Sequence, residues 1–280
     1  MDIISIFSGL SAVLLVTLLT IRLYDWQAER TQWTRLKSLQ SERPHAYDPK
    51  MVAELPEPAR RFFNYAISTG TELLSVAEID ISGQFSLGNK QQPNYQTMHA
   101  HQILASPYGF VWKTKLGGIV PISGSDSGKW TRFRIFGLLP VARIGDNFDH
   151  RLSAYGRYIA ESVFWTPAAV LPGPGVSWEA IDANSAQVTV CHGYLSQSVK
   201  IKVDAYGQLV EVSFLRWSNA NDNKKYQIQP FGGRLSDFRE VQGYHLPFYV
   251  EGGNMFGTDD YFAFYKAKIK QIHFPPKKII

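Results

Sequence analysis

The sequence predicts an α+β protein dominated by β structure, in which a large curved antiparallel sheet forms a half-barrel-like cradle with a covering central helix. About ten segments between residues 76 and 272 alternate apolar and polar side chains with a period of two, which is typical of antiparallel strands with one dry face. Only one long stretch among them has helical spacing. An uncharged apolar stretch at the N-terminus predicts that a transmembrane helix precedes the domain.

The segment Ile3–Ile21 is predicted to be this transmembrane helix and to contact the lipid bilayer. At about 1.5 Å per residue its length matches a hydrocarbon core of about 30 Å. Arg22, Tyr24 and Trp26 follow it and form the collar expected at a membrane interface. Asp2 and the lack of an Ala-x-Ala site argue against a cleaved signal peptide, so we expect a retained signal-anchor over residues 1–24. A buried core helix is the remaining alternative.

Residues 25–50 are predicted to form a juxtamembrane helical linker. Trp26, Trp33, Leu36 and Leu39 fall roughly on one helical face, between charged residues. Two interpretations are open: an interfacial helix that lies on anionic lipid, or a solvated helical stalk.

The flanking charges predict the orientation of the anchor. Several basic residues lie between Arg22 and Arg43, whereas the N-terminal side offers only the terminal amine. The positive-inside rule therefore slightly favours the cytoplasmic side for the globular domain. The single cysteine, Cys191, fits a reducing compartment but forms no internal disulfide in any compartment.

Residues 51–280 are predicted to form a single β-rich globular domain. Hydrophobic residues make up 45% of the chain and charged residues 19%, which is typical of a globular protein. The net charge of +5 is mild and the basic residues are dispersed, so the sequence argues against nucleic-acid binding. A short helix begins after Leu55 and ends before Gly70.

The strand-like segments follow this helix and are separated by turn residues. They are Val76–Leu87 and residues 97–105, 108–116, 129–136, 186–192, 197–204, 208–217, 225–231, 246–251 and 260–272. Because so many strands do not stay flat in one sheet, we expect the sheet to curl or close.

The central helix is predicted to run from a cap at Asp146 or Asn147 to about Trp165. One face, expected to pack on the sheet, is formed by Leu152, Tyr155, Ile159 and Val163. Arg157 and Glu161 fall on the opposite side, with Tyr158 and Trp165 between the two faces.

Several spaced segments of the domain occur in a recognisable order. They are Gly109–Trp112, Arg157–Leu171 (RYIAESVFWTPAAVL), Trp178–Asp182 (WEAID) and Phe231–Pro247 (FGGRLSDFREVQGYHLP). Over roughly residues 52–275 the chain resembles a family of bacterial proteins, often membrane-anchored, that is described only as a domain of unknown function. Tyr108, directly before the first segment, departs from the family's pattern.

This resemblance implies no established activity or cofactor. The family's strands around one long helix are similar in outline to the half-barrel cradles of periplasmic lipoprotein carriers, a fold analogy that gives a weak basis for function. The analogy also conflicts with a cytoplasmic placement, because those carriers work outside the inner membrane.

The candidate ligand-binding residues are Arg157, Tyr158, Glu161, Trp165, Trp112 and Trp178. Arg157 and Glu161 lie one helical turn apart and can hold a substrate or exchange protons. The alternatives are an exposed helix ion pair or a buried structural pair. Aromatic residues, 14% of the chain, either fill a core or line an apolar cavity for an acyl chain or isoprenoid.

Three functions remain open. The favoured one is non-catalytic binding of a lipid or other apolar ligand in the cradle, which requires no cofactor. The second is a hydrolase or transferase acting on a membrane-derived substrate, with Glu161, Asp182 and Glu240 as acid/base groups. The third is a non-catalytic envelope interaction protein. His99 and His101 share a strand face but form only a weak two-ligand pattern, so we expect no metal site.

Overall fold

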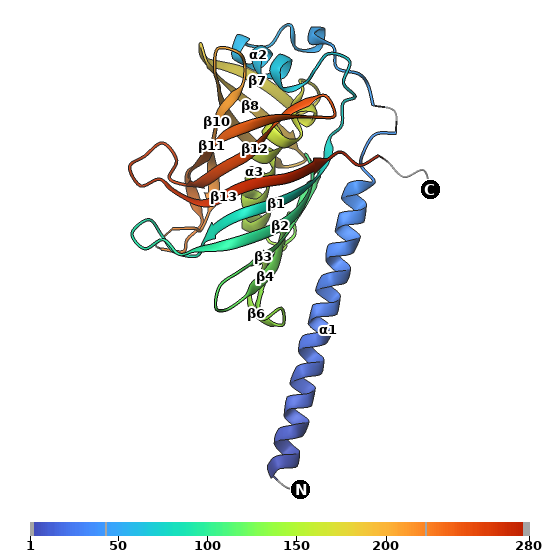
Figure 1. The fold of residues 1–280 in the computed structure, drawn as a ribbon, viewed down its shortest axis with the longest axis vertical. Helices are drawn as coiled ribbons and strands as arrows, with labels where there is room; N and C mark the ends of the chain where they lie inside the picture. The colour runs from blue at the N-terminus through green and yellow to red at the C-terminus, as the bar shows by residue number, and fades with distance from the viewer. Residues whose placement is uncertain (1–2, 43, 222, 277–280) are drawn as a thin grey trace.

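The computed structural model describes residues 3–42, 44–221 and 223–276, and these residues confirm the β-dominated α+β class (Figure 1). They form one 13-stranded sheet in the order β6-β5-β4-β3-β2-β1-β13-β12-β11-β10-β9-β8-β7, with every neighbouring pair antiparallel. The sheet thus consists of two meanders, β1–β6 and β7–β13, which join at the centre through the β1–β13 pair.

The bounds of the elements follow. The strands are β1 (Val76–Ser86), β2 (Tyr95–Ala105), β3 (Gly109–Leu116), β4 (Ile122–Ser127), β5 (Trp130–Ile135), β6 (Leu139–Gly145), β7 (Val176–Asp182), β8 (Ser185–His192), β9 (Leu195–Val203), β10 (Leu209–Ser218), β11 (Gln227–Val241), β12 (Tyr244–Asn254) and β13 (Phe262–His273). The helices are α1 (Ile3–Lys37), η1 (Pro49–Val52), α2 (Glu57–Ala66), α3 (Phe148–Trp165) and η2 (Pro167–Val170).

Three strands were not expected from the sequence: β4, β6 and β7. The β4 sequence, ISGSDS, has no apolar alternation and reads as a turn. The β6 sequence contains Pro140, which a sheet tolerates at an edge strand such as this one. β11 is also longer than the expected segment 225–231, because it continues through polar residues to Val241.

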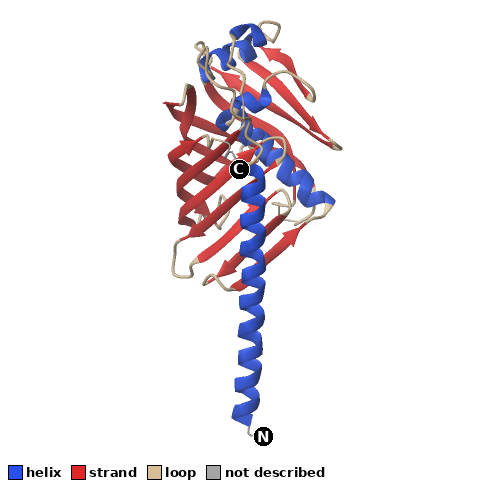
Figure 2. Cartoon of the chain, turned by 90° about the vertical axis from the view of Figure 1, so that its right-hand side faces the viewer, coloured by secondary structure: helices blue, strands red, loops and turns tan. Residues whose placement is uncertain are grey.

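Helix α3 occupies the concave face of the sheet because of its place in the chain. It connects β6 to β7, which are the two opposite edges of the sheet. Figures 1 and 2 show it crossing inside the curve of the strands, and it contacts β9, β10 and β12 as well as β2 and β3. Its N-cap is Asn147, whose side chain accepts a hydrogen bond from the His150 amide.

The expected sheet-facing residues of α3 lie in the main core. Tyr155, Ile159 and Val163 are fully buried, and Leu152 is half-buried. The expectation that Arg157 and Glu161 point away from the sheet is wrong, because the sheet curves around the helix. Its opposite side therefore faces strands of the first meander.

Helix α1 is continuous from the apolar segment to Lys37 and packs on the convex face of the sheet. Leu36 forms a second small core with Val76, Ile103 and Val111, whereas the next residues along these strands belong to the main core. Because side chains alternate across a strand, the two cores lie on opposite faces of the sheet. Trp33, Leu36 and Leu39 therefore pack on protein rather than on lipid or solvent, whereas Trp26 stays 46% exposed.

Polar contacts reinforce this packing of α1. Asp25, only 1% exposed, forms ion pairs with Arg132 (2.9 Å), Arg134 and Arg143 (2.5 Å) of β5 and β6. We call these four residues the convex cluster. Further along the helix, Glu29 accepts a hydrogen bond from Ser125 and Lys37 pairs with Glu78. The helix is long and apolar enough over residues 7–37 to cross a membrane. Its most apolar stretch of 18 residues is not buried against the rest of the described protein.

Candidate functional site

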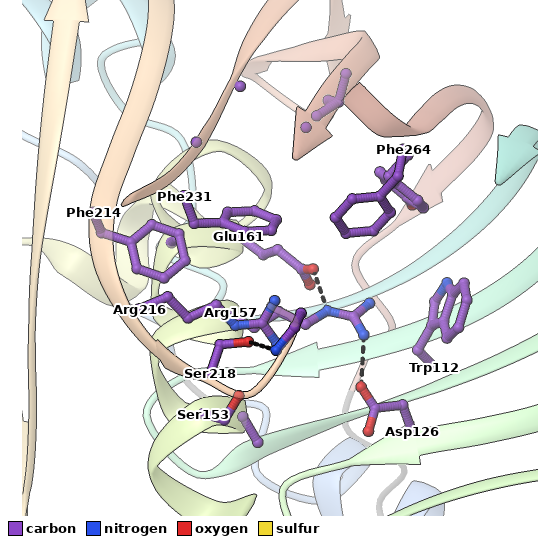
Figure 3. Close-up of a pocket in the computed structure, with 18 of the residues that line it drawn as sticks. Trp112, Asp126, Ser153, Arg157, Glu161, Phe214, Arg216, Ser218, Phe231 and Phe264 are labelled. Atoms are coloured by element: carbon purple, nitrogen blue, oxygen red, sulfur yellow. Dashed lines mark hydrogen bonds and ion pairs between the residues drawn. The ribbon is translucent and has the colours of Figure 1, made fainter. Parts of the chain in front are cut away.

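A cavity of about 340 Å³ lies between α3 and the concave face of the sheet (Figure 3). Its wall is mostly apolar and is contributed by both meanders. The aromatic residues that line it are Phe85, Trp112, Phe133, Phe164, Trp165, Phe214, Tyr226, Phe231, Phe264 and Tyr265. Because strand side chains alternate, each strand presents its concave-face residues to this one space.

An ion cluster lies in the wall of the cavity, centred on Arg157 of α3. The Arg157 guanidinium contacts Asp126 of β4 and Glu161 one turn later, each at 2.7 Å. Gln102 donates a hydrogen bond to the other Glu161 oxygen at 2.6 Å. The guanidinium also lies over the Trp112 ring, 5.0 Å from its centroid. Figure 3 shows Arg157 held between the two carboxylates.

These contacts keep Arg157 charged. Burial alone would lower its pKa, but the nearby carboxylates of Glu161 and Asp126 outweigh that effect and raise it. Both nitrogens that face the carboxylates are engaged, and both oxygens of Glu161 are bonded. Arg157 and Glu161 therefore form a buried pair that fastens α3 to the first meander.

Arg216 of β10 is the second cation of the cavity. Its guanidinium lies over the Phe231 ring at 5.0 Å, and it faces the cavity beside Arg157 in Figure 3. Within the described part of the chain it has no carboxylate within ion-pair distance, and its Nε is buried without a hydrogen-bond partner. Burial, and then the repulsion of Arg157, lower its pKa to about 10, so it stays protonated near neutral pH. We call Asp126, Arg157, Glu161 and Arg216 the concave cluster.

Two more buried donors of the wall lack partners. Among the described residues, Trp112 Nε1 and Trp165 Nε1 make no hydrogen bond, as with Arg216 Nε. A buried donor without an acceptor costs about 1–3 kcal/mol. The cavity is therefore apolar in most of its surface, and the Arg216 guanidinium is the cation in its wall without an acidic partner among the described residues.

His150 extends the polar side of the site. Its Nε2 lies 3.0 Å from the Thr131 hydroxyl, which donates to Asp126 at 2.6 Å. Burial lowers the pKa of His150 more than Asp126 and Asp146 raise it, so the imidazole is neutral at pH 7. A chain of contacts thus links His150 through Thr131 and Asp126 to Arg157.

The structure brings together four of the six candidate residues: Arg157, Glu161, Trp165 and Trp112 all line the cavity. Tyr158 and Trp178 do not. Both lie outside it because their rings fill other parts of the core.

Each of these two residues has a packing role. The Tyr158 hydroxyl donates to the Pro107 carbonyl at 3.1 Å, and its ring lies edge-on to Tyr155. Trp178 packs on Phe62 and Phe63 of α2.

Sequence reasoning missed Arg216, Asp126 and His150. A signal for Arg216 was present, because it has the same parity as the buried residues Val212 and Phe214 on its strand. A charged residue at a strand position that faces the core indicates either a buried ion pair or a binding site. Asp126 offered no such signal, since β4 itself lacks an apolar pattern.

The remaining candidates lie elsewhere. Asp182 and Glu240 are exposed and do not line the cavity. His101 contacts Asp80 and stacks on Trp33 of α1 with ring centroids 4.7 Å apart. His99 and His101 line a separate groove beside α1. Within the described ranges, no three His, Cys, Asp or Glu residues are placed to hold a metal ion.

Comparison with known proteins gives a family and two similar structures. A family model described as a family of unknown function (DUF6544) matches residues 45–267, which confirms the resemblance of the motifs. A LolA superfamily protein from Nitrosomonas europaea is 8% identical, with a TM-score of 0.40 over 78% of this chain and 92% of that chain. A putative outer membrane lipoprotein-sorting protein domain from Vibrio parahaemolyticus is 10% identical, with a TM-score of 0.36 over 81% and 91%. A search of curated proteins found no match.

Proposed function

The chain belongs to the DUF6544 family, and we propose that it is a membrane-tethered binding protein that holds an acyl-chain ligand in its cavity. The observation that carries this proposal is the aromatic wall between α3 and the concave face of the sheet. Its volume of about 340 Å³ falls within the range of small-ligand sites, about 300–1,000 Å³. Each methylene buried there contributes about 0.8 kcal/mol, so a chain of ten contributes about 8 kcal/mol before the costs of binding.

The unpaired cation of the wall specifies the chemistry of the ligand's polar end. Arg216 lines the cavity and has no carboxylate within ion-pair distance among the described residues. A carboxylate, ester or phosphate oxygen would bind its guanidinium through a charge-assisted hydrogen bond. We therefore expect an amphiphile whose oxygen-bearing end lies at Arg216 and whose chain lies among Phe214, Phe231 and the other rings.

Arg157 has a different part in this proposal. Asp126 and Glu161 already neutralise it, so it positions α3 rather than the ligand. The same contacts argue against the hydrolase or transferase alternative. Glu161 is the only one of the three proposed acid/base residues that lines the cavity, and both of its oxygens are occupied.

The tether is the second part of the proposal. Residues 1–24 serve as a single-pass anchor, and the rest of α1 connects it rigidly to the globular domain. The basic residues after Ile21 favour the cytoplasmic side for that domain. The tether would then keep the cavity near the bilayer that supplies such a ligand.

Native mass spectrometry of the full-length protein, released from detergent, with organic extraction of the sample, tests the binding function. The full chain is needed because Leu36 and Asp25 of α1 are buried against the sheet. We expect a stoichiometric acyl-containing molecule, or uptake of one from added membrane lipid. A mass that stays free of ligand after incubation with membrane lipid contradicts the proposal.

A cavity-filling variant locates the bound molecule. Ala160→Phe places a ring in the cavity wall and should abolish uptake. Ala263→Phe adds the same ring on β13 at a residue outside the cavity lining and should retain it. Equal uptake by both variants contradicts the placement of the ligand.

A further inference from the structure

Exposed apolar side chains gather where the first meander ends beside α1. Ile119 in the β3–β4 loop is fully exposed, and Phe136 in the β5–β6 loop is 65% exposed. The Phe136 amide donates to the Pro121 carbonyl at 3.0 Å, so the two loops form one unit. We call this unit the apolar tip; its exposed large apolar residues are Ile119, Val120, Phe136, Leu139 and Val141. Monomeric soluble proteins rarely leave such contiguous apolar surface in water.

The tip lies beside the end of the predicted membrane span. Arg134, two residues before Phe136, forms an ion pair with Asp25, which lies four residues after Ile21. Both Figure 1 and Figure 2 show the ends of these strands directed along α1 toward its N-terminal half. The opposite pole of the domain, with α2, is the part farthest from that half.

Buried contacts fix the position of the apolar tip along the axis of α1. The convex cluster joins α1 to β5 and β6, while Glu29 joins it to Ser125 of β4. Leu36 then anchors the helix in the second core. A bilayer that surrounds the apolar part of α1 therefore meets the tip at a defined depth.

Basic residues flank this position. A groove of about 440 Å³ between α1 and the convex face is lined in part by Arg22, Lys113 and Lys115. Trp26, which is suited to a membrane–water interface, also lines it. Cationic side chains at this level are attracted to anionic lipid headgroups, by about 1 kcal/mol each.

We propose that the apolar tip inserts into the interfacial layer of the same bilayer that α1 crosses, so that the domain contacts the membrane at two places. This inference rests on the proposed membrane-spanning role of α1. A second contact would fix the tilt of the domain and keep its cavity at a constant distance from the lipid. A protein partner or a second copy on the tip is the competing outcome.

Depth-dependent quenching tests this inference on the full-length chain. The exposed native thiol is first removed by Cys191→Ser, and single cysteines are then introduced and labelled with an environment-sensitive fluorophore. The labelled variants are Ile119→Cys and Phe136→Cys in the tip, Leu14→Cys within the span, and Tyr206→Cys in a turn that packs on α2. Each is reconstituted into nanodiscs of zwitterionic and anionic phospholipid that carry a quencher on the acyl chain.

We expect strong quenching at 14, clear quenching at 119 and 136, and none at 206, which is 85% exposed. Quenching at 14 combined with values at 119 and 136 as low as at 206 overturns the inference but leaves the anchor intact. Absence of quenching at 14 overturns the anchor and the inference together. Protection of 119 and 136 from an aqueous quencher without lipid quenching assigns the tip to a protein contact and also overturns it.

Discussion

Two helices pack on opposite faces of one sheet, and each is fastened by a cluster of arginines and carboxylates. On the convex face one carboxylate, Asp25 of α1, is surrounded by three arginines. On the concave face one arginine, Arg157 of α3, is shared by two carboxylates. In the convex cluster all three arginines share one carboxylate, whereas the concave cluster adjoins the cavity and includes Arg216, which has no acidic partner in the described part of the chain. Similar ion pairs can therefore fasten a helix on one face and border a binding site on the other.

Of the substitutions that test this comparison, we expect the largest loss of stability from one at Asp25 in the convex cluster. Asp25→Asn removes the only carboxylate among the described residues that directly pairs Arg134, which is buried and whose pKa burial already lowers to about 10. Removal of one partner from a buried pair costs about 3–5 kcal/mol. We expect that loss in the free energy of unfolding, measured by urea denaturation of the protein in detergent.

An exposed pair provides the control for Asp25. Asp237 and Arg239 lie 2.6 Å apart on the surface, so Asp237→Asn should change stability far less than Asp25→Asn does. Equal effects of the two substitutions would show that the convex cluster does not hold α1 to the sheet.

The second prediction concerns the concave cluster. Arg157→Met retains much of the side chain's length but leaves Asp126 and Glu161 without their shared cation. We expect a loss of about 3 kcal/mol in unfolding free energy at pH 7, near the lower end for a broken buried pair. A loss of less than about 1 kcal/mol would mean that Arg157 stabilises α3 mainly through its packing on Trp112.

The third prediction contrasts Arg216, which forms no ion pair among the described residues, with the paired Arg157 of the same cluster. Arg216→Met removes a cation that forms no ion pair among the described residues, so we expect stability to change by less than about 1 kcal/mol. The effect should appear in binding. The affinity for dodecanoic acid, measured by competition with a fluorescent acyl probe, should fall about tenfold, which is about 1.4 kcal/mol and close to one charge-assisted hydrogen bond.

Dodecane serves as the matched ligand for that measurement. It buries the same kind of chain but offers no oxygen, so its affinity should be nearly unchanged by Arg216→Met. Equal losses for both molecules would mean that Arg216 shapes the cavity without recognising the polar end. Unchanged affinity for dodecanoic acid would remove Arg216 from the proposed function.

The sequence predicted those parts of the site that depend on local pattern. Helical spacing placed Arg157, Glu161 and Trp165 on one element, and Trp112 was a candidate as an aromatic residue of the expected strand 108–116. The partners of Arg157 could not be predicted in this way, because Asp126 reaches it only after β4 joins the sheet and α3 crosses between the two edges.

Long-range pairing also explains the larger misses in the fold. The two meanders are joined by the pairing of β1 with β13, which are far apart in the sequence. No local pattern of residues predicts this pairing. Polar residues after Ile21 indicated lipid or solvent around the second half of α1, yet Asp25 is buried there because three arginines from β5 and β6 surround it. An amphipathic pattern predicts a packed face but does not identify what the face packs against.

The smallest expected effect is a pH dependence of the unfolding free energy, caused by His150 beside the concave cluster. Burial holds the pKa of His150 below its usual value, against the opposing influence of Asp126 and Asp146 and with the added repulsion of Arg216. The unfolded chain therefore binds a proton more readily, and the contribution of neutral His150 is present above about pH 6.5 and is lost as the pH falls through the folded pKa.

Unfolding free energies at pH 7.5, 6.5 and 5.5 measure this contribution. Between pH 6.5 and 5.5 we expect a decrease of at most about 1.4 kcal/mol from this group, which His150→Gln should abolish. The exposed residue His45 supplies the control, because His45→Gln should leave the slope unchanged. If the slope survives in the His150 variant, another group titrates there and the neutral imidazole is not part of the cavity wall's stability. If it disappears, His150 gives the cavity wall beside the concave cluster a pH sensitivity between pH 6.5 and 5.5.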